Sequence, residues 1–172
     1  MELSRRGFVT KGTAIISGTF YNRHEVFSNP NIRKTMSRPL IISTWPFGEA
    51  ANKKAMEVIN SGGSSLDAVE KGINVTENDK ENTSVGIGGL PNSEGIVQLD
   101  ACIMNGPEHE AGSVMGLEKI RNPISVARKV MENSDHIMLA GDGAYQFAIN
   151  QGFKKENILA EQSKKDWIEW KK

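Results

Sequence analysis

The stretch IVQLDACIMNGPEHEAGSVMG, residues 96–116, contains two apolar segments separated by a turn. Residues 96–104 form an apolar run of strand length, and Asn105-Gly106-Pro107 is a typical turn sequence. We expect residues 112–116 to return as a second strand, because a short connection of this kind joins antiparallel strands. The stretch therefore predicts a β-hairpin in the middle of the chain.

Helical patterns lie on both sides of this hairpin. Residues 49–60 carry apolar side chains at helical spacing, and Gly62-Gly63 ends that helix. Ser64 and Asp67 resemble a capping box at the start of a second helix, which should pack antiparallel to the first. Further helices are expected from Pro123, over 141–150 and over 163–172, and strands over 39–44 and 136–140, the former buried. This order predicts an α/β domain of the layered α+β kind.

The composition excludes several classes of protein. The 172 residues have zero net formal charge, 38% hydrophobic residues and 24% charged residues, which indicates one globular domain rather than a disordered chain or a polytopic membrane protein. The single cysteine excludes a disulfide framework and a multi-cysteine zinc site. With only three scattered histidines, we expect no metal and no cofactor.

The first 38 residues differ from the rest, with seven basic residues against two acidic ones. Residues 4–11, SRRGFVTK, resemble a twin-arginine export signal, and a weakly apolar stretch over 12–20 follows. That stretch is too short to span a bilayer. We assign residues 1–38 to a signal and linker and residues 39–172 to the folded domain, and expect a periplasmic or exported protein. A disordered basic tail is the alternative, and nothing further supports nucleic-acid binding.

The residues themselves offer only weak catalytic candidates. Cys102 could act as a nucleophile with His109 or His136 as its base, but its place within an apolar strand favours a buried, inert thiol. Asp100 and Asp142 could form an acid–base pair, although each could equally order a turn.

Other motifs also have structural explanations. The glycine-rich segment 86–89 lacks the spacing of a phosphate-binding loop and favours a close-packed sheet turn. Asp67 and Glu70 are better explained by helix capping and surface pairing than by catalysis. Taken alone, the residues predict an exported α/β domain with no defined reaction.

A resemblance extends this result. Six segments, in order across residues 39–172, are similar to the glycosylasparaginase (aspartylglucosaminidase) family: 43–47 (STWPF), 61–72 (SGGSSLDAVEKG), 84–91 (SVGIGGLP), 99–104 (LDACIM), 122–128 (NPISVAR) and 152–157 (GFKKEN). The similarity is closer than that to plant-type asparaginases and isoaspartyl peptidases, chiefly through the first and third segments.

The resemblance implies an N-terminal-nucleophile hydrolase with a four-layer αββα sandwich. In that family the precursor cleaves itself before a threonine in a His-Asp-Thr sequence. The new α-amine then serves as the base while the threonine hydroxyl attacks the side-chain amide of a glycosylated asparagine. No metal or cofactor takes part.

By the same resemblance, Trp45 lines the substrate pocket, with Phe47 as a weaker neighbour, and Ser84 hydrogen-bonds the nucleophilic threonine. The structural alternatives are a core aromatic residue at Trp45, packing at Phe47 and a strand-start cap at Ser84. His-Asp-Thr does not occur in these 172 residues. We therefore expect only the α-chain portion here, with Ser84 supporting a nucleophile that lies beyond it.

The expected partners are the β-chain half of the same precursor and a glycosylated asparagine substrate, in a heterodimer or a dimer of heterodimers. Two alternatives remain: a shortened, inactive family member, and an asparaginase or isoaspartyl peptidase. Because a sheet without its second half exposes edges and apolar surface, we expect the chain alone to aggregate or to be only partly ordered.

Overall fold

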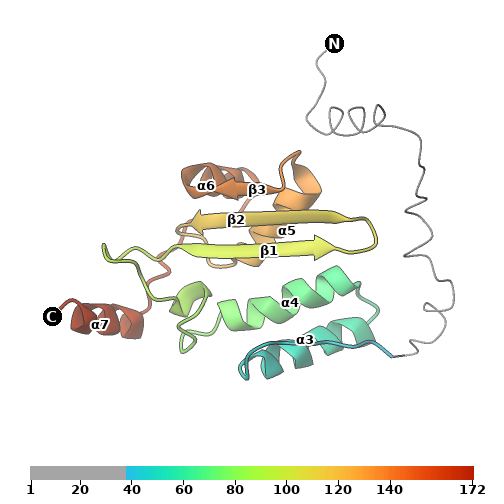
Figure 1. Ribbon diagram of the computed structural model, residues 1–172, viewed down its shortest axis with the longest axis horizontal. Helices are drawn as coiled ribbons and strands as arrows, with labels where there is room; N and C mark the ends of the chain where they lie inside the picture. The colour runs from blue at the N-terminus through green and yellow to red at the C-terminus, as the bar shows by residue number, and fades with distance from the viewer. Residues whose placement is uncertain (1–37) are drawn as a thin grey trace, which may run out of the picture. The chain divides into compact units, whose positions relative to one another are not determined.

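The computed structural model describes residues 38–172, and residues Pro39–Lys172 form one unit of the α/β class predicted above. The predicted signal lies outside the described residues. The elements, labelled in Figure 1, are α3 (Gly48–Asn60), α4 (Ser65–Glu77), the 3-10 helix η2 (Gly86–Gly88), β1 (Leu99–Asn105), β2 (Glu110–Leu117), α5 (Pro123–Asn133), β3 (Met138–Ala140), α6 (Gly141–Asn150) and α7 (Glu161–Trp170). In this described part, no helix combines the length and the apolar character needed to cross a bilayer.

The predicted hairpin is present. β1 pairs with β2 in antiparallel register from Leu99 opposite Leu117 to Asn105 opposite Glu110, with an irregularity between Leu99 and Ala101. There the Asp100 carboxylate accepts a 2.7 Å hydrogen bond from the main-chain N–H of Gly116. β3 pairs with β2 in parallel, which completes a three-stranded sheet of order β1-β2-β3.

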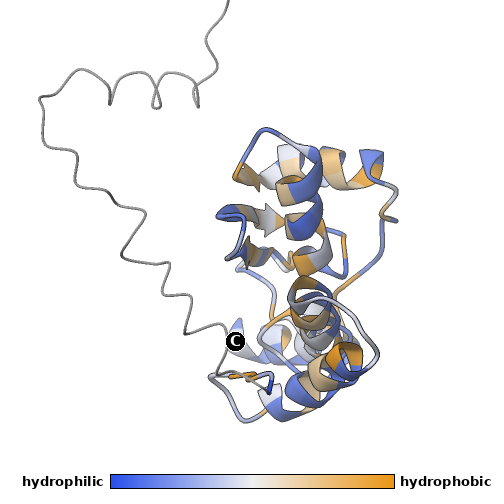
Figure 2. Ribbon diagram, turned by 90° about the vertical axis from the view of Figure 1, so that its right-hand side faces the viewer, coloured by the Kyte–Doolittle hydropathy of each residue, from blue (hydrophilic) through white to orange (hydrophobic). Residues whose placement is uncertain are grey.

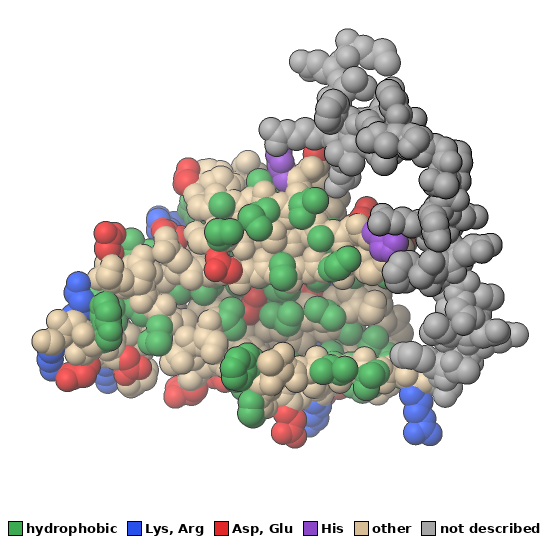
Figure 3. Space-filling model, viewed as in Figure 1, with side chains coloured by type: hydrophobic (Ala, Val, Ile, Leu, Met, Phe, Trp, Pro, Cys, Tyr) green, Lys and Arg blue, Asp and Glu red, His purple; other side chains and the backbone are tan. Residues whose placement is uncertain are grey.

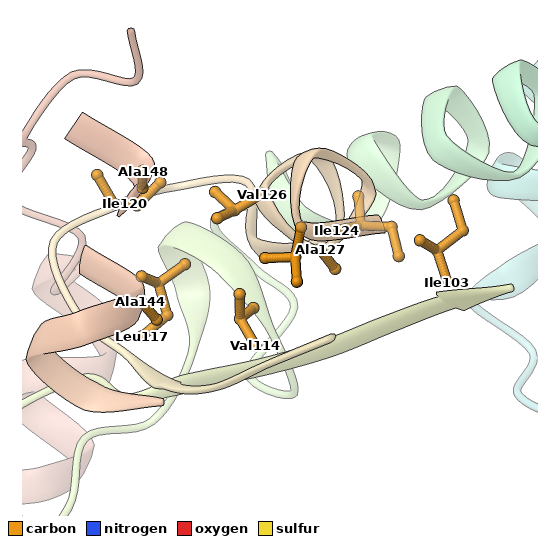
Figure 4. Packing of buried hydrophobic residues seen from close by; sticks show 10 residues of the cluster. Ile103, Val114, Leu117, Ile120, Ile124, Val126, Ala127, Ala144 and Ala148 are labelled. Atoms are coloured by element: carbon orange, nitrogen blue, oxygen red, sulfur yellow. The ribbon is translucent and has the colours of Figure 1, made fainter. Parts of the chain in front are cut away.

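The core lies between this sheet and two helices. α5 packs across β1 and β2, and α6 packs against β2 and β3. Figure 4 shows side chains of both layers meeting; the buried members of this cluster are Ile103, Val114, Leu117, Ile120, Ile124, Val126, Ala127, Val130, Ala144 and Ala148. Burying a Val, Leu or Ile side chain contributes about 1.5–3 kcal/mol, so this cluster is the main source of stability in the layer.

Gly112 allows α5 to approach the hairpin closely. A Cβ atom at this position would lie 2.1 Å from the Ala127 carbonyl oxygen and 2.5 Å from the Met131 nitrogen. Both are main-chain atoms of α5, so they cannot move aside as a flexible side chain would. The helix can therefore rest on β2 only where that strand has no side chain.

α3 and α4 form the predicted antiparallel pair, seen side by side in Figure 1. The predicted capping box is confirmed: Ser64 Oγ accepts from the Asp67 N–H, and the Asp67 carboxylate accepts from the Ser64 N–H. A Cβ at Gly72 would lie 2.8 Å from the Ala51 carbonyl oxygen, so a glycine permits this close packing. Both hydrophobic and hydrophilic segments appear along the helices in Figure 2, as expected for elements that cover a core on one side.

Two predictions about local secondary structure were wrong. Residues 39–44 do not form a buried strand: they are extended but unpaired within the described residues, and Leu40 and Ile42 are 72% and 82% exposed. An apolar run becomes a strand only where another strand completes its hydrogen bonds. The glycine-rich segment forms a buried 3-10 turn rather than a sheet turn. It packs against main-chain atoms of Glu77, and Gly86 has the left-handed φ of 70° that only glycine adopts readily.

Within residues 38–172, no element covers the face of the sheet opposite α5. Met104, Met115 and Met138, one on each strand, are 65%, 48% and 52% exposed there. This face points toward the viewer in Figure 3, where hydrophobic side chains are spread over the strands and charged side chains lie mainly around the edge. We refer below to the open face, defined by Cys102, Met104, Met115 and Met138.

Candidate functional site

Trp45 and Phe47 lie in the turn that leads into α3. The Gly48 N–H donates to the Trp45 carbonyl at 2.9 Å, and the Glu49 N–H donates to the Pro46 carbonyl at 3.1 Å, so this turn is joined to the first turn of the helix. The two aromatic rings stack, with centroids 6.5 Å apart and planes inclined by 14°. Trp45 is 65% exposed. It is therefore not the core aromatic residue of the structural alternative.

Ser84 lies in the loop between α4 and η2. Its N–H donates to the Asn82 side-chain oxygen at 2.9 Å, and the Leu90 N–H closes the loop onto the Thr83 carbonyl at 3.2 Å. The residue is exposed, and within residues 38–172 its hydroxyl makes no hydrogen bond. No strand begins at Ser84. The loop thus presents the hydroxyl to solvent from a defined backbone.

The fold places these candidates at the same end of the helix pair. α3 and α4 are antiparallel and each has 13 residues, so the start of α3 lies beside the end of α4. The aromatic pair precedes α3 and the Ser84 loop follows α4. No hydrogen bond links the two groups among the described residues, and a groove of about 470 Å³ between segment 39–43 and the helices is not lined by them.

Tight packing fixes the loop that carries Ser84. A Cβ on Gly86 would lie 2.0–2.5 Å from main-chain atoms of Glu77, and one on Gly88 would lie 2.3 Å from the Asn82 carbonyl oxygen. Both glycines are buried. Because no other residue fits these approaches without a backbone shift, the glycine-rich segment holds the position of Ser84 relative to the end of α4.

Glu77 is a structural centre that the sequence reasoning missed. It is fully buried, and its carboxylate accepts hydrogen bonds from Asn74, Asn122 and the main chain of Ile124. Burial raises the pKa of Glu77 above its ordinary value, although these three hydrogen bonds act in the opposite direction. A glutamate at the end of a helix, before a polar loop, gives no sequence signal for such a role.

Asp67 and Glu70 have the structural roles expected for them. Arg128 Nη1 lies 2.7 Å from Asp67 Oδ1 and 2.9 Å from Glu70 Oε2, which joins α5 to α4. Hydrogen bonds from Ser64 and then from Arg128 lower the pKa of Asp67 to about 2. The same guanidinium bonds Glu132 at 2.6 Å. These carboxylates are engaged in ion pairs between helices.

The remaining candidates do not assemble into a catalytic group. Cys102 is exposed on the open face, so the prediction of a buried thiol was wrong. The alternation of β1 places Cys102 opposite to the buried Ile103, on the side of the sheet that faces away from α5. Neither His109 nor His136 is hydrogen-bonded to it. Within residues 38–172, no group of three or more His, Cys, Asp or Glu side chains could hold a metal ion.

Asp100 and Asp142 are also separate in function. Asp100 orders the β1–β2 irregularity through Gly116, whereas Asp142 lies in the first turn of α6. A carboxylate there interacts favourably with the helix dipole. Each therefore has the local role that was the alternative to an acid–base pair.

The sequence matches the family described as Asparaginase over residues 31–172. It is 54% identical to N(4)-(Beta-N-acetylglucosaminyl)-L-asparaginase of Elizabethkingia miricola, over 100% of this chain and 51% of that protein. It is 42% identical to the Rattus norvegicus protein of the same name, over 83% of this chain and 42% of that protein.

Another relative is the plant-type L-asparaginase of Pyrococcus abyssi, 47% identical over 63% of this chain and 35% of that protein. The chain thus spans about half the length, or less, of these relatives. The match to the Asparaginase family covers most of the sequence, and identity to one relative extends over all of it. The chain belongs to the asparaginase family.

Proposed function

We propose that this chain supplies the N-terminal part of an amidohydrolase that cleaves N4-(β-N-acetylglucosaminyl)-L-asparagine. The observation that carries the proposal is the 54% identity to the Elizabethkingia miricola protein along the whole chain. The plant-type asparaginase aligns with a smaller share of the chain. This difference in coverage favours glycosylated asparagine over free asparagine as the substrate.

In this proposal the nucleophile is an N-terminal threonine produced by self-cleavage in a second half of the protein. Threonine attack on the side-chain amide gives an acyl-enzyme, and water then releases aspartate. Ser84 hydrogen-bonds the threonine and tunes its α-amine. The Ser84 hydroxyl is exposed, makes no hydrogen bond within the described residues and lies on a tightly packed loop. This supports the role, since a fixed donor or acceptor loses little freedom on engagement.

Trp45 forms one wall of the substrate pocket, with Phe47 stacked behind it. The support is the 65% exposure of the Trp45 ring beside the end of α4, where the Ser84 loop begins. A large aromatic ring left in solvent is the kind of surface that a ligand or a second chain covers.

The second half also covers the open face in this proposal. The three exposed methionines on adjacent strands offer an apolar layer to a second sheet, which gives the four-layer sandwich. The complete protein is then a heterodimer of the two halves or a dimer of such heterodimers.

A hybrid protein tests the activity. Residues 39–172 are joined to the portion of the Elizabethkingia miricola protein that lies beyond the alignment. The hybrid should release aspartate from N4-(β-N-acetylglucosaminyl)-L-asparagine faster than from asparagine or a β-aspartyl dipeptide. If it folds but hydrolyses none of the three, the inactive alternative is correct; faster hydrolysis of asparagine or the dipeptide would support the other branch.

We also infer that residues 1–38 direct export through the twin-arginine route. The support is the order Arg5-Arg6, a large apolar residue, a weakly apolar stretch and a polar linker. A reporter protein fused behind residues 1–38 should reach the periplasm of a bacterium. Replacement of both arginines by lysine should retain it in the cytoplasm, and export that continues unchanged would exclude this route.

A further inference from the structure

The turn between β1 and β2 contains a chemically reactive pair of residues. Asn105-Gly106 is the only Asn-Gly pair in the sequence. Asn105 ends β1 opposite Glu110, and Gly106 is exposed in the turn. A Cβ added to Gly106 would have no heavy atom within 4 Å. The turn is thus open around Gly106, whose main-chain nitrogen directly follows Asn105.

Hydrogen bonds do not restrain the two groups that would react, the Asn105 side-chain amide and the Gly106 N–H. Among the described residues, neither the Asn105 side-chain amide nor the Gly106 N–H makes a hydrogen bond, and the nearest turn contact is His109 N–H to the Gly106 carbonyl at 3.3 Å. Glycine has the widest choice of backbone angles. Its nitrogen can therefore swing toward the Asn105 Cγ atom, and an intramolecular reaction of this kind gains greatly from proximity.

We propose that Asn105 is a site of spontaneous deamidation, which leaves isoaspartate in the hairpin turn. The Gly106 nitrogen loses its proton to water and bonds to Asn105 Cγ, and ammonia leaves as the C–N bond of the side-chain amide breaks. The resulting five-membered succinimide is opened by water at either carbonyl, which gives aspartate or the β-linked isoaspartate. The overall reaction consumes one water and releases one ammonia, with no oxidation or reduction.

Other asparagines are protected by contacts that Asn105 lacks. Asn92 also lies in a turn, but its side-chain oxygen accepts from the N–H groups of Glu94 at 2.9 Å and Ile96 at 3.1 Å. Asn122 precedes Pro123, whose nitrogen has no proton to lose, and its amide donates to Glu77. Asn92 is the internal control for the requirement of a free asparagine side chain. Asn122 is the control for the requirement of an N–H group on the following residue.

The modification changes only the tip of the hairpin. It adds a carboxylate close to Glu108 and Glu110, and isoaspartate inserts a methylene group into the main chain at the last pair of the ladder. β1 has seven residues, so its start, where the segment from the Ser84 loop arrives, is about 20 Å away. The candidate site therefore stays unchanged as the turn ages.

The test uses the hybrid protein, in which residues 39–172 are joined to a second half, kept in warm, neutral buffer and digested at intervals for mass spectrometry. Among the peptides of residues 39–172, the one containing residue 105 should be the first to gain the mass of an amide-to-acid change. An isoaspartyl methyltransferase should label the product, with isoaspartate exceeding aspartate. The peptides with Asn92 and Asn122 should stay unchanged. Gly106→Ala, which the open space around Gly106 tolerates, should slow the reaction, and Asn105→Gln should abolish the product.

The same incubation in urea separates folded from unfolded reactivity. Conversion of Asn105 in native buffer supports the proposal. Conversion only in urea would mean that the folded hairpin holds the two groups apart, and the proposal would be wrong. Conversion of Asn92 as fast as Asn105 in native buffer would likewise overturn it, because the contacts described above would then have no protective effect.

Discussion

The side chain of Glu77, the last residue of α4, accepts a 2.8 Å hydrogen bond from the main-chain N–H of Ile124 in the first turn of α5. Asn122 occupies the N-cap position of α5 but makes no side-chain cap; its amide donates to Glu77 at 2.9 Å instead. The Glu77 carboxylate, 47 residues before Ile124, thus accepts from a main-chain N–H at the start of α5 that has no acceptor within the helix. Main-chain atoms of Glu77 also pack closely against Gly86. Glu77 therefore joins α4, α5 and the Ser84 loop.

Glu77→Ala should lower the free energy of unfolding by about 3 kcal/mol, because it removes the buried acceptor of three hydrogen bonds. The measurement is the urea unfolding midpoint of the hybrid protein. Glu81→Ala is the matched control, since Glu81 is an exposed residue of the next loop, and it should change the value by less than about 0.5 kcal/mol. Equal effects of the two substitutions would contradict the assignment.

Asp67 should make the stability depend on pH in the acid range. Its pKa is about 2 in the folded chain, against an ordinary value of 3.8, owing to Ser64 and then Arg128. A lowered pKa gives a contribution that is present above the ordinary value and is lost as the pH falls through the folded value. Asp67→Asn should therefore be destabilising at neutral pH, and its difference from the parent should vanish near pH 2.

Asp135→Asn is the control for that series, since Asp135 is exposed. It should have the parent's stability throughout the acid titration. If Asp67→Asn also keeps the same offset from the parent at all pH values, the ionisation of Asp67 does not contribute to the joint between α4 and α5.

Gly112→Ala should destabilise the layer by about 3 kcal/mol or more, because the added Cβ would overlap main-chain atoms of α5. Gly143→Ala is the opposite case. Gly143 lies in α6 with open space around it, and alanine is favoured in a helix by about 1 kcal/mol. The melting temperatures of both variants are the measurement, with a decrease expected for Gly112→Ala and none for Gly143→Ala. An unchanged melting temperature for Gly112→Ala would show that α5 does not pack on β2 as described.

Trp45→Ala should lower the kcat/KM of the hybrid for glycosylated asparagine by about tenfold or more, which corresponds to about 1.4 kcal/mol of transition-state stabilisation. Its assembly and melting temperature should stay unchanged, because the ring is largely exposed. Trp170→Ala removes an indole that is 70% exposed on α7 and should leave the kinetics unaltered. Unchanged kinetics for Trp45→Ala would remove this residue from the site.

The chain alone should associate through the open face. Sedimentation velocity should show oligomers or aggregates for residues 39–172, and Met104→Lys with Met115→Lys should reduce them, because charges on an uncovered sheet oppose pairing. A monomeric profile with a sharp, cooperative thermal transition for the unchanged chain would disprove this expectation.

Most of the fold could be predicted because its signals are local. The Ser64–Asp67 capping box, the turn at Asn105-Gly106 and Pro123 at the start of α5 each lie within a few residues of the structure they specify. Predictions failed where a partner far along the chain decides the outcome. Residues 39–44 lack a strand to pair with among the described residues, and Cys102 lies on a strand whose alternation does not reveal which face is covered.

The candidate site was less predictable than the fold. Nothing in the spacing around Trp45 or Ser84 indicates chemistry, so both came from the resemblance to a family. The role of Glu77 depends on donors in α5, 45 and 47 residues away, which a linear pattern does not show. The structure contributes the common location of the two candidates at one end of the helix pair.

Residues 39–172 should work as the first half of an amidohydrolase. The release of aspartate from N4-(β-N-acetylglucosaminyl)-L-asparagine by the hybrid protein, measured beside each half alone, tests this function. The hybrid should release aspartate, and neither half alone should do so. A hybrid that folds and cleaves itself but leaves this substrate intact would show that residues 39–172 do not have this function.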